Sequence, residues 1–89
     1  MRSLGEYHLS GEINSRVPDV HAVIDRLKAA YADGEQNFLD GITVYYSDWH
    51  FNVRPSANDP VVRLNLEAKS DAMMQQKRDE LLALIRQDA

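Results

Sequence analysis

The chain of 89 residues contains no cysteine, which excludes disulfide bonds, thiolate catalysis and cysteine-ligated metal sites. It also lacks a long apolar run, so the sequence predicts neither a membrane-spanning helix nor a signal peptide. Positive charge is scarce, with 10 Lys and Arg against 14 Asp and Glu and a formal net charge of −4. This balance argues against bulk binding to nucleic acid or to an anionic membrane. The lack of cysteine agrees with a cytoplasmic protein.

Catalytic patterns are equally scarce. His8, His21 and His50 are dispersed and lack the spacing of metal ligands. No pair of carboxylates stands out as an acid/base couple, no Ser/His/Asp order is readable, and there is no glycine-rich nucleotide loop. The residues alone therefore show nothing that could catalyse a demanding reaction unaided. A ligand contact by His50 and an ordinary surface histidine both remain open.

The first part of the chain predicts a strand followed by a helix. Apolar residues at 7, 9, 13 and 17 alternate with polar ones, and Gly11 interrupts them as a bulge or as part of an interdomain linker. Residues 1–12 are therefore treated as a lead-in. Pro18-Asp19 is a helix start, and the helical spacing of apolar residues runs to about Ala32, with Gly34 as the C-terminal cap residue.

The second part predicts a hairpin, a third strand and a closing helix. Residues 35–41 are interpreted as a connection, and residues 42–46 and 49–54 as two strands joined by a tight turn at Ser47-Asp48. Residues 61–68 alternate again, and Ser70-Asp71 starts a second helix. The order is β-α-β-β-β-α. We expect one domain over residues 1–89, a two-layer α+β fold with a four-stranded, mainly antiparallel sheet and both helices on its dry face.

The connection between the last two strands carries the most distinctive chemistry, reading Arg54-Pro55-Ser56-Ala57-Asn58-Asp59-Pro60. If the strands pair, Arg54 and Arg63 lie on the same polar face beside the turn. Arginine offers a planar fork of donors that matches phosphate oxygens, and free backbone N–H groups of a turn can cradle an anion. The sequence thus allows two interpretations, a phosphate-binding loop or an ordinary hairpin connection with a solvated arginine.

Residues 40–42, 48–56 and 60–68 resemble the C-terminal domain of the phosphomannomutase/phosphoglucomutase (α-D-phosphohexomutase) family, and residues 10–14 resemble the segment that leads into it. The resemblance covers nearly the whole chain and implies a TATA-box-binding-protein-like fold. It also implies a four-domain cytoplasmic enzyme that moves a phosphoryl group between the 1 and 6 positions of a hexose. In that family a phosphoserine lies in the first domain, Mg²⁺ in the second and sugar recognition in the third, while the last domain closes over the substrate.

The resemblance also implies which residues bind the substrate phosphate. The family loop reads Arg-x-Ser-Asn/Gly-Thr-x-Pro, so Arg54 and Ser56 carry over directly. Ala57 replaces Asn/Gly and still offers its backbone N–H, while Asn58 replaces Thr and offers its side-chain amide. Arg63 is present in some members. The resemblance places no cofactor and no catalytic residue in this domain, and it implies that the isolated chain is inactive.

A stand-alone interaction module is the alternative. In that interpretation the solvent-exposed face of the sheet, with Tyr45 and His50, binds a protein partner, and the chain has no catalytic activity. A reading frame confined to residues 1–89 would favour the module, whereas a long upstream extension would favour the enzyme domain. The sequence does not distinguish mannose from glucose phosphates.

Overall fold

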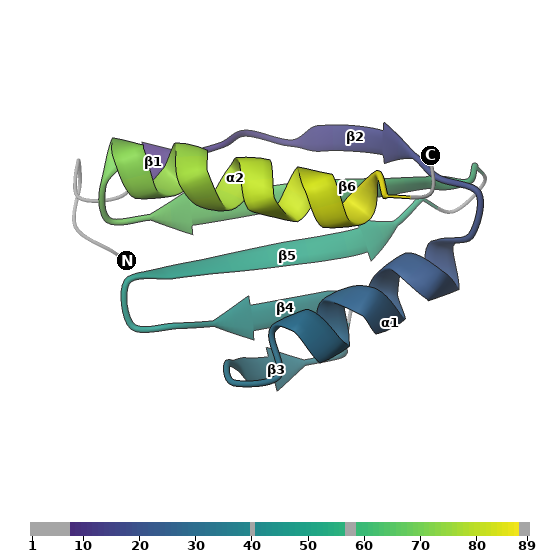
Figure 1. Cartoon of the computed structure of the whole chain (residues 1–89), viewed down its shortest axis with the longest axis horizontal. Helices are drawn as coiled ribbons and strands as arrows, with labels where there is room; N and C mark the ends of the chain where they lie inside the picture. The colour runs from purple at the N-terminus through teal and green to yellow at the C-terminus, as the bar shows by residue number, and fades with distance from the viewer. Residues whose placement is uncertain (1–7, 40, 57–58, 88–89) are drawn as a thin grey trace.

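The computed structural model describes residues 8–39, 41–56 and 59–87, and this part forms one antiparallel sheet and two helices. Along the chain the elements are β1 (His8–Leu9), β2 (Ile13–Arg16), α1 (Val20–Ala30), β3 (Glu35–Asn37), β4 (Ile42–Tyr45), β5 (Trp49–Pro55), β6 (Val61–Ala68) and α2 (Asp71–Ile85). The strand order is β1-β6-β5-β4-β3, and β2 also pairs with β6, beside β1 (Figure 1).

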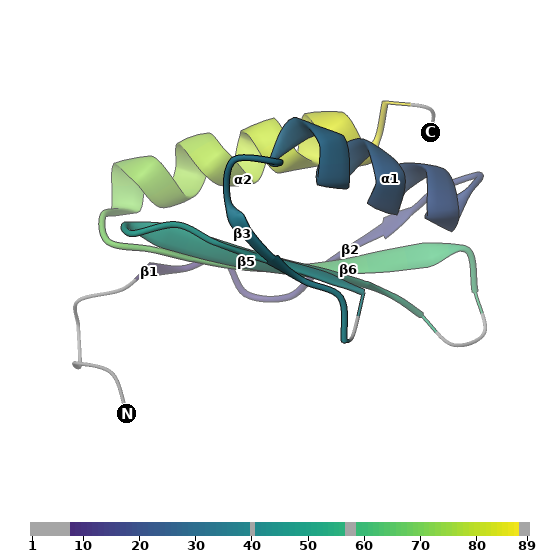
Figure 2. The same cartoon turned by 90° about the horizontal axis from the view of Figure 1, so that it is seen from below.

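Both helices cover the same face of the sheet, and the other face is open (Figure 2). The cause is the alternation along β5 and β6, because successive side chains of a strand point to opposite faces. Phe51 and Val53 on β5 and Leu64 on β6 are completely buried beneath the helices, together with Leu27 of α1 and Leu81 of α2. The predicted α+β class and the two-layer arrangement with both helices on one face are confirmed.

The sheet has more strands than the four predicted, because β3 forms in residues 35–41, which were interpreted as a connection. Glu35-Gln36-Asn37 shows no apolar alternation, so periodicity gives no sign of a strand. It pairs with β4, and the Gln36 side chain donates to the carbonyl oxygens of Lys28 and Tyr31 at 3.0 Å each. Tertiary contacts, rather than local propensity, make this edge strand.

The predicted interruption at Gly11 divides the first strand into β1 and β2. Leu9 is opposite Glu67 and Ile13 is opposite Leu64, so three residues on one strand face two on β6. This is a bulge, and Gly11 has a φ of +75°, which suits glycine. Strand β1 therefore lies inside the stretch 1–12 predicted as a lead-in, whereas residues 1–7 lie outside the described part.

The two helices begin at the predicted caps. The Asp19 carboxylate accepts from the Ala22 N–H at 3.2 Å, and the Ser70 hydroxyl accepts from the Met73 N–H at 3.1 Å. The prediction that Gly34 caps α1 is wrong, because the helix ends at Ala30 with Tyr31 as its cap residue. Gly34 serves close packing instead, since a Cβ there would lie 2.4 Å from Cγ1 of Val44.

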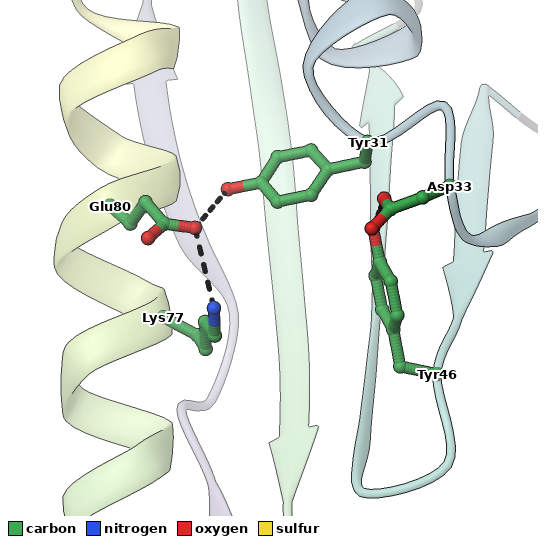
Figure 3. Close-up of polar contacts among 5 residues, drawn as sticks. All are labelled: Tyr31, Asp33, Tyr46, Lys77 and Glu80. Atoms are coloured by element: carbon green, nitrogen blue, oxygen red, sulfur yellow. Dashed lines mark hydrogen bonds and ion pairs between the residues drawn. The ribbon is translucent and has the colours of Figure 1, made fainter.

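Two tyrosine hydroxyl groups form hydrogen bonds near the end of α1 (Figure 3). The Tyr31 hydroxyl donates to Glu80 on α2 at 2.7 Å, and the Tyr46 hydroxyl donates to Asp33 at 2.7 Å. Lys77 also pairs with Glu80 at 3.6 Å. Burial and the nearby carboxylates raise the pKa of both tyrosines, so both stay protonated donors well above neutral pH. Within the described residues, neither helix has the length and apolar content needed to cross a membrane.

Candidate phosphate-binding site

Arg54 and Arg63 are direct cross-strand partners on the open face of the sheet. Their sequence neighbours Val53 and Val62 are completely buried, so the two arginine side chains leave the sheet on the opposite side from the helices. Residues opposite each other on an antiparallel pair have Cβ atoms about 4.5–5.5 Å apart, so the two arginine side chains start side by side. The predicted shared face of the two arginines is therefore confirmed, and it concentrates positive charge on an acidic chain.

The base of the loop between β5 and β6 is held by three backbone hydrogen bonds. The Ser56 N–H donates to the Val61 carbonyl at 2.8 Å, the Val61 N–H to the Asp59 carbonyl at 2.7 Å, and the Val17 N–H to the Pro60 carbonyl at 2.8 Å. The amide of Ser56 is consequently not one of the free loop amides expected from the sequence. Its hydroxyl remains the group by which Ser56 would contact an anion. Ala57 and Asn58, the other two predicted ligands in the loop, lie outside the described residues.

Gly41, at the start of β4, lies directly against the backbone of Arg54. Its φ is +77°, and a Cβ at this position would lie 2.3 Å from the Val53 carbonyl oxygen and 2.7 Å from Cα of Arg54. Only a residue without a side chain allows β4 to approach β5 so closely here. The sequence indicated a connection over residues 35–41, but the contact between Gly41 and Arg54 was not predicted.

Two further charged residues reach this end of the open face from beside β6. Ser15 is buried, and its hydroxyl accepts from Nε of Arg86, the residue that follows α2, at 3.0 Å, so its neighbour Arg16 points to the open face. Arg16 is opposite Val61, at the base of the loop. Glu12 lies 3.7 Å from Nε of Arg63. Neither residue was predicted, because a buried serine does not reveal from sequence which face its strand neighbours take.

His50 lies farther along the same face, and its Nε2 contacts Oε1 of Glu67 at 2.9 Å. The Tyr45 ring packs beside it, with 5.7 Å between ring centroids. His50 and Glu67 line a hollow of about 210 Å³ on the open face. Its lining residues are Leu9, Gly11, His50, Asn52, Asn65, Leu66 and Glu67. His50 is thus in contact with the carboxylate of Glu67 on the neighbouring strand β6. Among the described residues no group of three His, Asp or Glu could hold a metal ion.

Comparison with known proteins agrees with this fold. Residues 12–84 match the phosphoglucomutase/phosphomannomutase C-terminal domain family. A phosphomannomutase of Methanocaldococcus jannaschii is 39% identical over 84 residues, which cover 94% of this chain and 19% of that protein. A phosphomannomutase of Salmonella typhimurium is 40% identical over 97 residues, covering 97% of this chain and 21% of that protein.

A solved structure supports the same relationship. The crystal structure of a phosphoglucomutase/phosphomannomutase family protein from Burkholderia thailandensis superposes with a TM-score of 0.67 and 29% identity, over 91% of this chain and 18% of that one. The chain belongs to the phosphoglucomutase/phosphomannomutase C-terminal domain family. It spans about a fifth of the length of the curated relatives it matches.

Proposed function

We propose that this chain is the substrate-binding C-terminal domain of a phosphohexomutase, and that Arg54, Ser56 and Arg63 bind the phosphate of a hexose phosphate. The observation that carries the proposal is the direct pairing of Arg54 with Arg63 on the open face beside the loop. The match to the phosphoglucomutase/phosphomannomutase family and relatives described as phosphomannomutases support a mannose or glucose phosphate as the substrate class. The enzyme interconverts hexose 6-phosphate and hexose 1-phosphate in the cytoplasm.

Electrostatics supports an anion at this position. Two guanidinium groups that start from opposite cross-strand positions can both attract a dianionic phosphate placed between them. Each arginine fork donates charge-assisted hydrogen bonds, which are worth roughly 1.5–3 kcal/mol apiece. The Ser56 hydroxyl lies at the base of the same loop and adds a neutral donor. In the proposal Ala57 contributes a backbone N–H and Asn58 its side-chain amide.

The domain contributes positioning rather than chemistry. Phosphoryl transfer and its Mg²⁺ belong to the rest of the enzyme, and the isolated chain is inactive. Holding the non-reacting phosphate lets binding energy far from the reacting end orient the sugar, which raises the rate by fixing the geometry of the reacting groups. The domain closes over the substrate as a lid.

The direct test is the affinity of the chain for mannose 1-phosphate, measured by NMR titration. Arg54→Ala should weaken binding by about 1.5–3 kcal/mol, the worth of a charged hydrogen bond. Arg54→Lys should recover only part of that loss, because an ammonium group cannot form the planar fork.

The matched control is Arg78→Ala on α2, which pairs with Asp79 at 3.1 Å on the opposite side of the molecule and should leave the affinity unchanged. Equal losses for Arg54→Ala and Arg78→Ala would reduce the effect to net charge and contradict the site.

The open face also offers a surface for another protein domain. Tyr45 is 46% exposed and packs beside His50, which lines the hollow, and Leu9 is 58% exposed. We propose that the remaining domains of the same enzyme contact this surface when the lid closes. A Tyr45→Ala substitution should then raise KM in the full-length enzyme while leaving phosphate affinity of the chain unchanged. A stand-alone module, the alternative function, would instead bind an unrelated protein through Tyr45 without any phosphate affinity.

A further inference from the structure

The contact between Glu12 and Arg63 places a carboxylate where a bound phosphate would compete for the same guanidinium group. Oε2 of Glu12 lies 3.7 Å from Nε of Arg63, and the two side chains are 44% and 42% exposed. At that separation the contact is an ion pair without a good hydrogen bond. An exposed pair of this kind is weak and can exchange its partner for another anion.

The topology puts Glu12 and Arg54 on opposite sides of Arg63. Glu12 lies between β1 and β2, which flank one side of β6, whereas Arg54 is on β5 along the other side. Without an anion, the Glu12 carboxylate partly offsets the positive charge of Arg63. With a phosphate bound, the same carboxylate repels the ligand.

The bulge makes this arrangement possible. Gly11 has a φ of +75°, and its ideal Cβ position has no atom within 4 Å, so the segment is open around it. The extra residue in the bulge displaces the chain from the regular register just before Ile13. Glu12 is therefore presented to Arg63 from an irregular segment instead of from a paired strand position.

We infer that Glu12 is an internal competitor of the substrate phosphate: it occupies Arg63 in the unliganded domain and is displaced when the phosphate binds. This inference rests on the proposed function of the Arg54–Arg63 pair. Its consequence is specificity. A dianionic phosphate that forms forked hydrogen bonds to both arginines displaces the carboxylate, whereas a singly charged anion competes poorly.

The test compares the affinity of the chain for mannose 1-phosphate in wild type and in Glu12→Gln, by NMR titration at low ionic strength. Removing the competing charge while keeping the side-chain shape should tighten binding about 3- to 10-fold, and added salt should shrink the gain. Glu35→Gln is the matched control, because it makes the same change in net charge on β3, at the other edge of the sheet. It should change the affinity less than about twofold.

A double-mutant cycle separates competition at Arg63 from a general field effect. In an Arg63→Ala background, Glu12→Gln should tighten binding less than about twofold, because the contested partner is gone.

An affinity for Glu12→Gln that equals or falls below wild type would overturn the inference and leave the phosphate site intact. A gain that persists undiminished without Arg63 would also overturn it. If neither wild type nor Glu12→Gln binds mannose 1-phosphate, the proposed function fails and the inference fails with it.

Discussion

The two faces of the sheet are built from the same strands, but one is buried and apolar and the other is exposed and polar. On β5, Phe51 and Val53 are completely buried under the helices, while Asn52 and Arg54, their neighbours in sequence, face outward and are partly exposed. The covered face is held by apolar burial, which is non-directional and tolerates no charge. The open face carries polar and charged side chains, among them two arginines across from each other. The difference teaches that apolar burial on the covered face stabilises the fold, which leaves the open face able to carry the charged groups of a binding site.

The largest effect should come from the covered face. Phe51→Ala removes a fully buried ring that packs against Tyr31 and Trp49, with 5.0 and 5.6 Å between ring centroids. It should lower the free energy of unfolding by about 3–5 kcal/mol in urea titrations, through lost burial and the cavity left behind. Asn52→Ala, the neighbouring change on the open face, should cost no more than about 1–2 kcal/mol. Comparable losses at both positions would contradict the division between the faces.

The second largest loss of stability should come from a substitution at Gly41, which we compare with the same substitution at Gly11. Gly41→Ala should cost roughly 2–4 kcal/mol of unfolding free energy, because it combines a left-handed backbone with a clash against Val53 and Arg54. It should also weaken phosphate binding by displacing Arg54. Gly11→Ala, at nearly the same φ but in open space, should cost only about 1–2 kcal/mol. If the two variants have the same stability and affinity, Gly41 does not position Arg54.

The tyrosine contact between the helices should give a smaller change. Tyr31→Phe keeps the ring but removes the hydrogen bond to Glu80, and should cost about 1 kcal/mol at neutral pH. Because burial and Glu80 raise the pKa of Tyr31 in the folded chain, the unfolded state loses its proton first, and stability should fall as pH rises beyond about 10. The Phe variant should show a shallower fall between pH 10 and 12. If stability falls equally with pH in the wild type and in Tyr31→Phe, the raised pKa of Tyr31 does not cause the fall.

The smallest effect is expected at Arg16. Its place on the open face, opposite Val61, puts it near the proposed phosphate position without a direct pairing to Arg54. Arg16→Ala should weaken binding of mannose 1-phosphate by about 0.3–1 kcal/mol, and the loss should disappear at high salt because it is purely electrostatic. A loss as large as that of Arg54→Ala would make Arg16 a direct ligand.

The sequence predicted the strands and faces that depend on alternation. The alternation in 49–54 and 61–68 was enough to place Arg54 and Arg63 on one side, because their apolar neighbours could only point to the core. The polar strand β3 was missed because its side chains carry no apolar period and it is formed by contacts from α1. Glu12 and Arg16 were missed because their orientation depends on a bulge at Gly11 and on the burial of Ser15.

The most direct test of the account is a map of backbone amide shifts when mannose 1-phosphate is added to the chain. We predict that the largest shifts lie at Arg54, Ser56 and residues 61–63, at the loop end of the open face where β2 runs into α1 (Figure 1). Helix α2 should stay unchanged. Shifts centred on α2, or on the hollow around His50 with none at Arg54 and Arg63, would contradict the central claim that the arginine pair binds the phosphate.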